Sequence, residues 1–314
     1  MNSDVCSDDL FQQKDDTGNT ILTIACRYQP DAVQCILDSV YCSPVFLRQQ
    51  LKQSNHNALM IACRYNSTVV NQILESKHCS AELIEQCDAW KNTALMIACI
   101  CQPSAIELIM GPSNLDDPFY QWFDPLNKMI HAQNINGDTL LMIACRRCPA
   151  TVNCIFNSRY CSHELVCCKN NAGSTALIIA GKYQKTVLIK QFMESEYCSD
   201  KLMNTVNCMG ESILSVVCKF QSQSQSQSDI INYIIASKYM PEIRRRYWKR
   251  SRFVHLCNLV FYRKYHNCHK SHKNGLDNTN SIEKCDTVND IRNTNDDNNW
   301  HETSWLLKTK NTII

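Results

Sequence analysis

The segment between residues 255 and 272 contains the residue types that most often bind metal. Structural zinc takes four such ligands in a closed tetrahedron, and ligands paired as C-x-x-C are typical of these sites. The spacing Cys257-x10-Cys268-x3-His272 lacks that pair, and a chain with 21 Cys and nine His brings such residues together by chance. We therefore predict no metal and no other cofactor. The members of this group are His255, Cys257, His266, Cys268, His269 and His272.

Catalytic fingerprints are absent from the sequence. It has no nucleophile elbow, zinc-protease helix, phosphate-binding loop or dinucleotide-binding motif. Cys167 and Cys168 are adjacent, unlike the two cysteines of a redox C-x-x-C motif. Acidic residues do not recur as a pair that could divide acid and base roles. We predict that the protein is not an enzyme.

A basic segment follows residue 243. Residues 243–273 contain ten Lys or Arg and no Asp or Glu, with aromatic residues interleaved. This composition is found in nucleic-acid-binding segments and nuclear-import signals, and also on the solvated face of a helix that ends an array. Binding of nucleic acid is the less favoured alternative for this protein. The residues of the predicted basic patch are Arg244, Arg245, Arg246, Lys249, Arg250 and Arg252.

An aromatic cluster is the second candidate for binding. It lies in an insertion between residues 111 and 135, and acidic residues flank it. Insertions in repeat arrays map to loops on one face, often the binding face. The alternative is a longer helix that packs its aromatic side chains on the neighbouring repeats. The predicted partner-binding residues are Phe119, Tyr120, Trp122 and Phe123.

An internal repeat organises the chain before the basic segment and contains the aromatic insertion. The stretch 93–99 occurs in six degenerate copies, and a small residue near the end of each copy marks the period. The markers are separated by 37, 36, 46, 36 and 37 residues, which is typical of a stacked helical array. The markers are Ala25, Ala62, Ala98, Ala144, Ala180 and Val217.

The sequence pattern of each repeat predicts three helices. The first begins at a good N-cap, such as Thr139, is apolar nearly all round and must be covered on several sides. The second has apolar pairs at i, i+3 and i+4, which make one buried stripe. The third is one or two turns long and begins at a Cys-Ser step, where Ser is a good N-cap. Asn, Asp and Gly turns lead into the next repeat, and the Gln/Ser stretch 221–228 is expected to be a flexible loop.

The cysteines and the termini indicate the compartment. Cys26, Cys63, Cys99 and Cys145 occupy the same repeat position, and equivalent points on stacked helices lie about 8–10 Å apart. A disulfide needs Cα atoms within roughly 7 Å, so we expect free buried thiols and a reducing compartment. Residues 1–10 show no signal peptide, and no apolar run is long enough to span a bilayer. A net charge of +2 does not indicate which kind of partner the protein binds, so any electrostatic signal must be local.

The copies of Thr-Ala-Leu-Met-Ile-Ala, each after an Asn, Asp or Gly turn and before an amphipathic helix, resemble the ankyrin-repeat opening Thr-Pro-Leu-His-x-Ala. The resemblance covers about residues 5–243 and is greatest to divergent ankyrin-type proteins of giant amoeba-infecting DNA viruses. It implies a non-enzymatic scaffold for protein partners. The period of 36–37 exceeds the usual 33, and the second position is never Pro. Whether a β-hairpin finger is retained between repeats is therefore left open.

We predict an all-α helical solenoid of about six ankyrin-like repeats with a disordered C-terminal tail. Its function is to bind a protein of unknown identity, with an effector role on host proteins implied by the resemblance. Two alternatives are an adaptor that recruits ubiquitin machinery through residues 240–314 and a nucleic-acid-binding role for residues 244–273. We expect a monomer, away from membranes, in the host cytoplasm or nucleus. The predicted divisions are a half-repeat cap at 1–16, the array at 17–243, a basic capping segment at 244–267 and the tail at 268–314.

Overall fold

The computed structural model describes residues 11–110, 123–219 and 225–239. The chain divides into two units, Met1–Arg250 and Ser251–Ile314, and every described residue belongs to the first. In this part the secondary structure is helical, with one isolated β-bridge between Val206 and Ser212 and no strand. The predicted all-α helical repeat solenoid is confirmed. The predicted division at 16/17 and those beyond residue 243 stay predictions.

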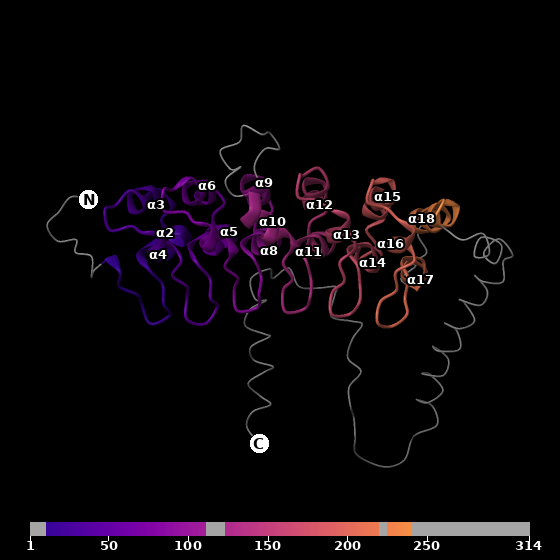
Figure 1. Ribbon diagram of the computed structural model, residues 1–314, viewed down its shortest axis with the longest axis horizontal. Helices are drawn as coiled ribbons and strands as arrows, with labels where there is room; N and C mark the ends of the chain where they lie inside the picture. The colour runs from indigo at the N-terminus through magenta and orange to yellow at the C-terminus, as the bar shows by residue number, and fades with distance from the viewer. Residues whose placement is uncertain (1–10, 111–122, 220–224, 240–314) are drawn as a thin grey trace, which may run out of the picture. The chain divides into compact units, whose positions relative to one another are not determined.

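The first helices of the repeats form an inner row (Figure 1). Each contacts the equivalent helix of the next repeat, from α2 through α5, α8, α11 and α14 to α17. Their apolar character explains this position, because residues 94–99 of α8 are all buried. The inner helices are α2 (Ile21–Tyr28), α5 (Ala58–Tyr65), α8 (Ala94–Cys101), α11 (Leu140–Arg147), α14 (Ala176–Lys182) and α17 (Ile213–Lys219).

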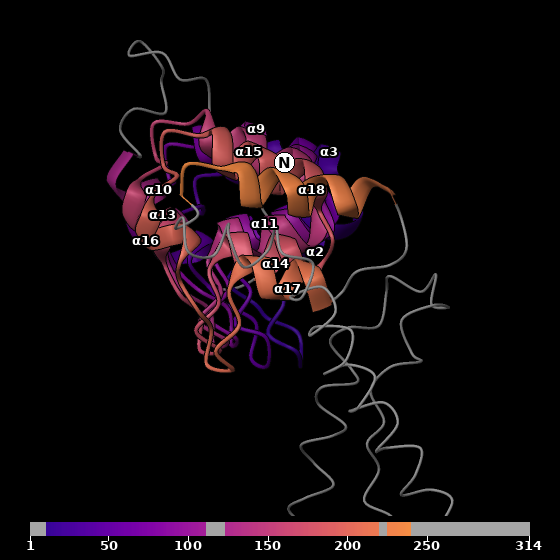
Figure 2. The same ribbon diagram turned by 90° about the vertical axis from the view of Figure 1, so that its right-hand side faces the viewer.

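The second helices form an outer row that covers one side of the inner row (Figure 2). Each packs on the inner helix of its own repeat through the predicted apolar pairs. In α6, for example, Val69, Val70, Ile73 and Leu74 are buried. The outer helices are α3 (Pro30–Leu37), α6 (Thr68–Glu75), α9 (Ser104–Met110), α12 (Pro149–Phe156), α15 (Thr186–Glu194) and α18 (Gln225–Ala236).

The third helices are short, as the Cys-Ser steps predict. Ser43, Ser80, Ser162 and Ser199 each cap one, accepting a hydrogen bond from the backbone N–H three residues later at 3.1–3.3 Å. In the third repeat the equivalent helix is longer because the insertion supplies extra residues. The third helices are α4 (Pro44–Leu47), α7 (Ala81–Glu85), α10 (Phe123–His131), α13 (His163–Cys167) and α16 (Asp200–Met203).

Two local expectations are corrected. Residues 225–228 were expected in a flexible loop, but they begin α18, because Gln tolerates a helix well and the apolar stripe that follows anchors it. Thr139 was expected to cap α11 through its hydroxyl, but it makes no such bond, whereas Thr20, Asn57, Thr93 and Thr175 do cap their helices.

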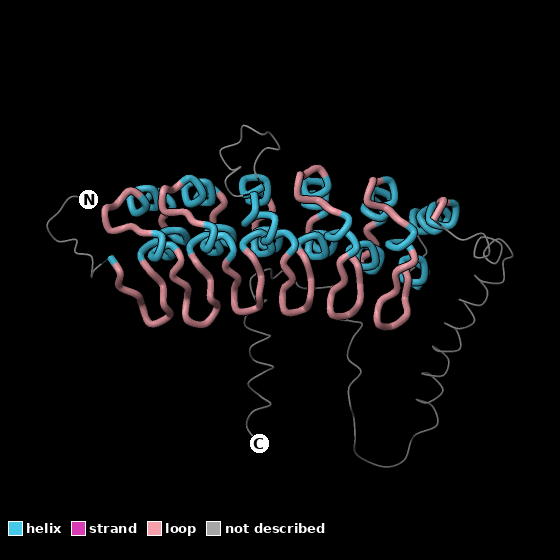
Figure 3. The backbone as a smooth tube through the Cα atoms, viewed as in Figure 1, coloured by secondary structure: helices cyan, strands magenta, loops and turns pink. Residues whose placement is uncertain are grey.

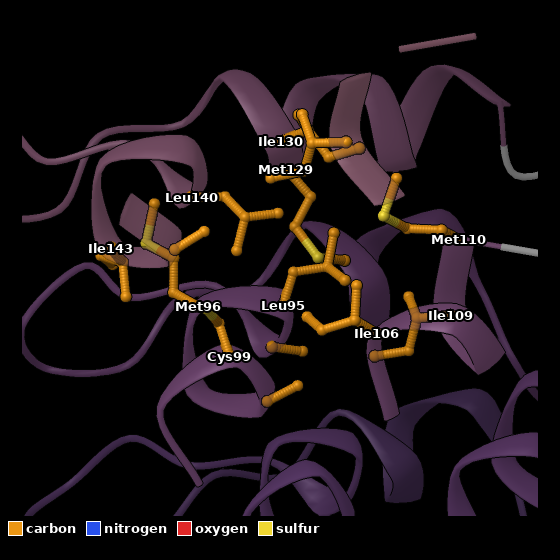
Figure 4. Close-up of a cluster of buried hydrophobic side chains, with 14 of the residues drawn as sticks. Leu95, Met96, Cys99, Ile106, Ile109, Met110, Met129, Ile130, Leu140 and Ile143 are labelled. Carbon is orange, nitrogen blue, oxygen red and sulfur yellow. The ribbon is translucent and has the colours of Figure 1, made fainter. Parts of the chain in front are cut away.

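The core lies where the three helices of one repeat meet those of the next (Figure 4). Leu95 and Met96 of α8 lie beside Ile106 of α9, Met129 of α10 and Leu140 of α11, and all five side chains are buried. The cysteines at the repeated inner position fill this core as small apolar residues. Cys26, Cys63, Cys99 and Cys145 are buried, and the cysteines of the described residues are free thiols.

A charge at an inner position is expected to unfold the array. Ile97 is 5% exposed, whereas Ile100, one turn later in the same helix, is 47% exposed. We expect Ile97→Asp to lower the free energy of unfolding by more than about 4 kcal/mol, because it buries an unpaired carboxylate. Ile100→Asp should cost no more than about 1 kcal/mol. Urea denaturation followed by circular dichroism measures both, and equal losses would contradict the burial assigned to α8.

Candidate interaction surface

The predicted aromatic anchors fall mostly outside the described residues, where Phe119, Tyr120 and Trp122 lie. Phe123 is the first residue of α10, and further along this helix three apolar side chains are buried in the core. The described part of the insertion is therefore a longer third helix, and partner binding by the four aromatic residues stays a prediction. The buried residues of α10 are Leu126, Met129 and Ile130.

The predicted basic patch stays untested as well, because its residues between 244 and 252 lie outside the part of the chain that the structure describes. Among described residues, no group of three or more His, Cys, Asp or Glu side chains could hold a metal ion. None of the helices formed by these residues is long and apolar enough to cross a membrane. Among the described residues, the loops between repeats form a regular row at the surface.

These loops project side by side along one edge of the array (Figure 3). We call them the finger loops and define each as the five residues before an inner-helix N-cap. The sequence left open whether they form β-hairpins, and within the described chain they are turns without strands. The finger loops are residues 15–19, 52–56, 88–92, 134–138, 170–174 and 207–211.

A shared side-chain hydrogen-bond pattern closes five of the six finger loops. Each of the five begins with Asp or Asn, whose side-chain oxygen accepts from the backbone N–H groups two and four residues later. Asn134 Oδ1 accepts from Asn136 and from Asp138, both at 3.0 Å. The second loop differs because it begins with Lys52. The equivalents of Asn134 are Asp15, Asp88, Asn170 and Asn207.

Backbone hydrogen bonds join each finger loop to the next. The carbonyl of the third residue of one loop accepts an N–H from the start of the following loop, so five bonds link six loops. They give these backbone groups partners in the neighbouring repeat and so contribute to the spacing of the loops. The bonds run from Lys52 to Thr17 (3.1 Å), Ala89 to Ser54 (2.9 Å), Ile135 to Trp90 (3.0 Å), Asn171 to Asn136 (3.0 Å) and Cys208 to Ala172 (2.9 Å).

Polar side chains join the bases of neighbouring loops. Asn134 Nδ2 donates to Asn92 Oδ1 at 3.1 Å, and Asn170 Nδ2 donates to Asp138 Oδ1 at 2.8 Å. Asp138 is buried and also accepts from Arg146 at 2.8 Å, so its charge is compensated. Between the second and third loops, the corresponding contact is a buried pair of His56 and Asp88, whose Nε2 and Oδ2 atoms lie 3.7 Å apart.

The side chains on this constant backbone differ from loop to loop. The second and third residues of each loop are exposed or half-buried, and within each of the two positions no residue type occurs twice. Loops held on a rigid framework are where binding residues concentrate. The second residues are Asp16, Gln53, Ala89, Ile135, Asn171 and Cys208, and the third residues are Thr17, Ser54, Trp90, Asn136, Ala172 and Met209.

Sequence reasoning identified the turns but missed the row that they form. The available signal was an Asp or Asn five residues before the N-cap combined with Gly two residues before it, as in Asn134 with Gly137 and Asn170 with Gly173. Each such Gly has a positive φ, and its N–H donates to the backbone carbonyl of the Asp or Asn three residues earlier.

Neither a protein-family model nor a curated protein matches this sequence. Among solved structures, it resembles a chain in the structure of the Bd0816 predatory endopeptidase from Bdellovibrio bacteriovorus in complex with immunity protein Bd3460. The TM-score is 0.50 at 19% identity, over 70% of this chain and 99% of that one. It also resembles the ankyrin repeat domain of Bcl-3, a member of the IkappaB family, with a TM-score of 0.48 at 19% identity, over 71% and 86%. At this identity the likeness concerns the fold, a helical repeat solenoid.

A methyl group added at two equivalent glycines should reveal the packing of the finger row. Gly173 and Gly210 have φ of +70° and +73°. A Cβ on Gly173 would lie 2.9 Å from the backbone N and 3.0 Å from the Sγ of Cys208, whereas a Cβ on Gly210 would meet nothing within 4 Å. Each Ala substitution costs about 1–2 kcal/mol for the positive φ. We expect Gly173→Ala to cost at least about 1 kcal/mol more, because of overpacking.

Thermal and urea unfolding of the two variants measure this difference. Gly210→Ala is the matched control because it introduces the same residue at the same position of the repeat. If the two variants lost equal stability, the close approach of neighbouring finger loops would be contradicted.

Proposed function

We propose that this protein is a non-enzymatic scaffold that binds another protein through its finger loops. The observation that carries the proposal is the constant backbone of these loops together with their variable exposed side chains. Five inter-loop hydrogen bonds hold the backbone, while the second and third positions carry a different residue in every loop. A row of this kind can match a partner residue by residue without any change of framework.

Preorganisation explains how such a surface gains affinity. Ordering a loop on binding costs conformational entropy, and loops that are already fixed avoid most of that cost. The Asx turns provide this order locally. In the first loop, hydrogen bonds from the side chains of Asn19 and Thr17 hold the pKa of the Asp15 carboxyl at about 2, so the carboxylate that closes the turn is charged at neutral pH.

The chemistry of the described residues supports a binding role over a catalytic one. Cysteine is abundant in this chain, at 21 residues, and a reactive cysteine needs a lowered pKa. Burial instead raises the pKa of the Cys26 and Cys99 thiols to about 12, so both are neutral and inert at physiological pH. The exposed Cys101 also has a raised pKa, and burial is the largest cause.

The narrower functions depend on other parts of the chain. An effector role on host proteins in virus-infected cells, and the corresponding cytoplasmic or nuclear location, are implied by the sequence resemblance. The adaptor and nucleic-acid hypotheses depend on residues 240–314 and 244–273, which lie outside the described residues. These functions stay predictions.

Substitution of exposed finger residues should abolish partner capture without unfolding. Ile135 and Met209 are exposed apolar side chains on two finger loops, and the backbone hydrogen bonds of both residues do not involve their own side chains. We expect Ile135→Ser/Met209→Ser to lose at least about tenfold in affinity for the physiological partner, since exposed apolar anchors carry much of the binding energy of an interface. Quantitative affinity purification from amoeba lysate measures the loss.

The matched control is Val40→Ser/Val187→Ser, because these two valines are exposed apolar residues outside the finger loops. Proteins captured by the wild type and by the control, but not by the finger variant, are the predicted partners. Equal capture by the finger variant and the control would contradict the proposal, as would recovery of nucleic acid as the only specific ligand.

A further inference from the structure

The charges of the two helix rows have opposite signs. The inner helices contain six Lys or Arg residues and no Asp or Glu. The outer helices contain five acidic residues and one Lys. The net charge of +2 for the whole chain therefore does not reveal that positive and negative charges lie on different helix rows. The inner cations are Arg27, Arg64, Arg146, Arg147, Lys182 and Lys219, and the charged residues of the outer helices are Asp31, Glu75, Glu107, Lys190, Glu194 and Asp229.

The inner cations gather at one end of each helix, in the last turn. Three tyrosines stand beside them: Tyr28, Tyr65 and Tyr183 are the residues that follow Arg27, Arg64 and Lys182, and all three are exposed. We call the set of these cations and tyrosines the basic–tyrosine stripe. Its members are Arg27, Tyr28, Arg64, Tyr65, Arg146, Arg147, Lys182, Tyr183 and Lys219.

Contacts between repeats join members of the stripe at two places. The guanidinium of Arg27 lies over the ring of Tyr65 in the next repeat at 4.5 Å, and that of Arg146 lies over Tyr183 at 5.6 Å. In the third repeat the stripe carries Ile100 and Cys101 instead. Arg64 and Arg147, from the repeats on either side, both lie close enough to lower the pKa of the Cys101 thiol, against the larger effect of burial.

Helix stabilisation accounts for only part of this pattern. A cation in the last turn complements the helix dipole, and that explains one Lys or Arg per helix. It does not explain why Tyr28 is 62% exposed and Tyr183 is 43% exposed, or why Ile24 of α2 and Ile100 of α8 are exposed on the inner helices. Exposed aromatic and Arg side chains with neighbouring aliphatic ones are the composition of interface hot spots.

We propose that the basic–tyrosine stripe binds an acidic protein segment that also carries apolar side chains. Carboxylates pair with the cations, and the apolar side chains lie on the exposed side chains of Ile24 and Ile100. A nucleic acid fits less well, because Arg27 and Arg146 already cover the tyrosine faces on which bases would stack. This inference rests on the proposed scaffold function and specifies the chemistry of its partner.

The geometry sets the length of the segment. Neighbouring inner helices pack at about 8–10 Å, so six repeats span roughly 40–50 Å. An extended chain covers that span with about 14 residues. Arg146 and Lys219 already form ion pairs with Asp138 and Glu211, so the exposed cations Arg27 and Lys182 and the half-buried Arg64 are the ones best placed for a partner.

Selection from a displayed library of random peptides, each about 14 residues long, tests the proposal on the full chain. We expect peptides bound by the wild type at low salt to be enriched in Asp and Glu together with Leu, Ile or Phe. R27E/R64E/K182E should lose this enrichment and bind the selected peptide at least about tenfold more weakly. The wild-type affinity should fall as salt is raised, because the exposed charges are screened.

The control K77E/K190E/K201E reverses three exposed lysines away from the stripe and should keep the enrichment. R27Q/R64Q/K182Q removes the same stripe charges more gently and replaces the first variant if that one unfolds on heating. Peptides without an acidic bias, or with a bias that the stripe variants retain, would overturn the inference and leave the finger-loop scaffold intact.

Two further outcomes would also overturn it. One is a dimer, detected by light scattering, that the stripe variants dissociate, since the acidic outer row of a second copy would then be the occupant. The other is binding of an oligothymidylate probe that the stripe variants abolish. If in addition no protein were captured through the finger loops, the proposed function would fail with it.

Discussion

The inner helices cannot be stable alone, and this constraint organises the rest of the structure. In α8 the residues from 94 to 99 are all buried, so the helix presents apolar side chains in every direction except at its end. A neighbouring inner helix on each side and an outer helix behind supply the necessary cover. Because every repeat needs its neighbours in this way, stability belongs to the array and is a sum over interfaces between repeats.

Stacking at a fixed spacing also determines what the rest of each repeat can do. It brings successive finger loops close enough for the carbonyl of Trp90 to accept from Ile135, and it brings Arg27 over Tyr65. The hydrogen bond fixes the backbone of the finger loops. The Arg27–Tyr65 contact places a positive charge in the basic–tyrosine stripe. Exposed side chains that make neither contact, such as those of Met209 and Ile135 at the loops, can differ between repeats without loss of fold.

The sequence alone predicted the elements that depend on local and periodic signals. Ser43 and Ser80 cap short helices as expected, and Val69 and Ile73 are buried as their spacing indicates. It did not predict contacts between repeats, because a hydrogen bond such as Cys208 to Ala172 depends on the exact rise from one repeat to the next. The basic–tyrosine stripe was missed for a related reason. A basic residue followed by Tyr is common at the end of a single helix, and the pairs form a surface only when the helices stack side by side.

The central claim is that backbone hydrogen bonds between finger loops hold a constant frame for variable side chains. Hydrogen–deuterium exchange resolved to single amides tests it directly on the full chain. The N–H groups of Ala89, Ile135, Asn171 and Cys208 should exchange at least about a thousandfold more slowly than in an unstructured peptide, which corresponds to an opening free energy of about 4 kcal/mol. Exchange of these amides at the rate of an unstructured peptide, while the inner helices remain protected, would contradict the account.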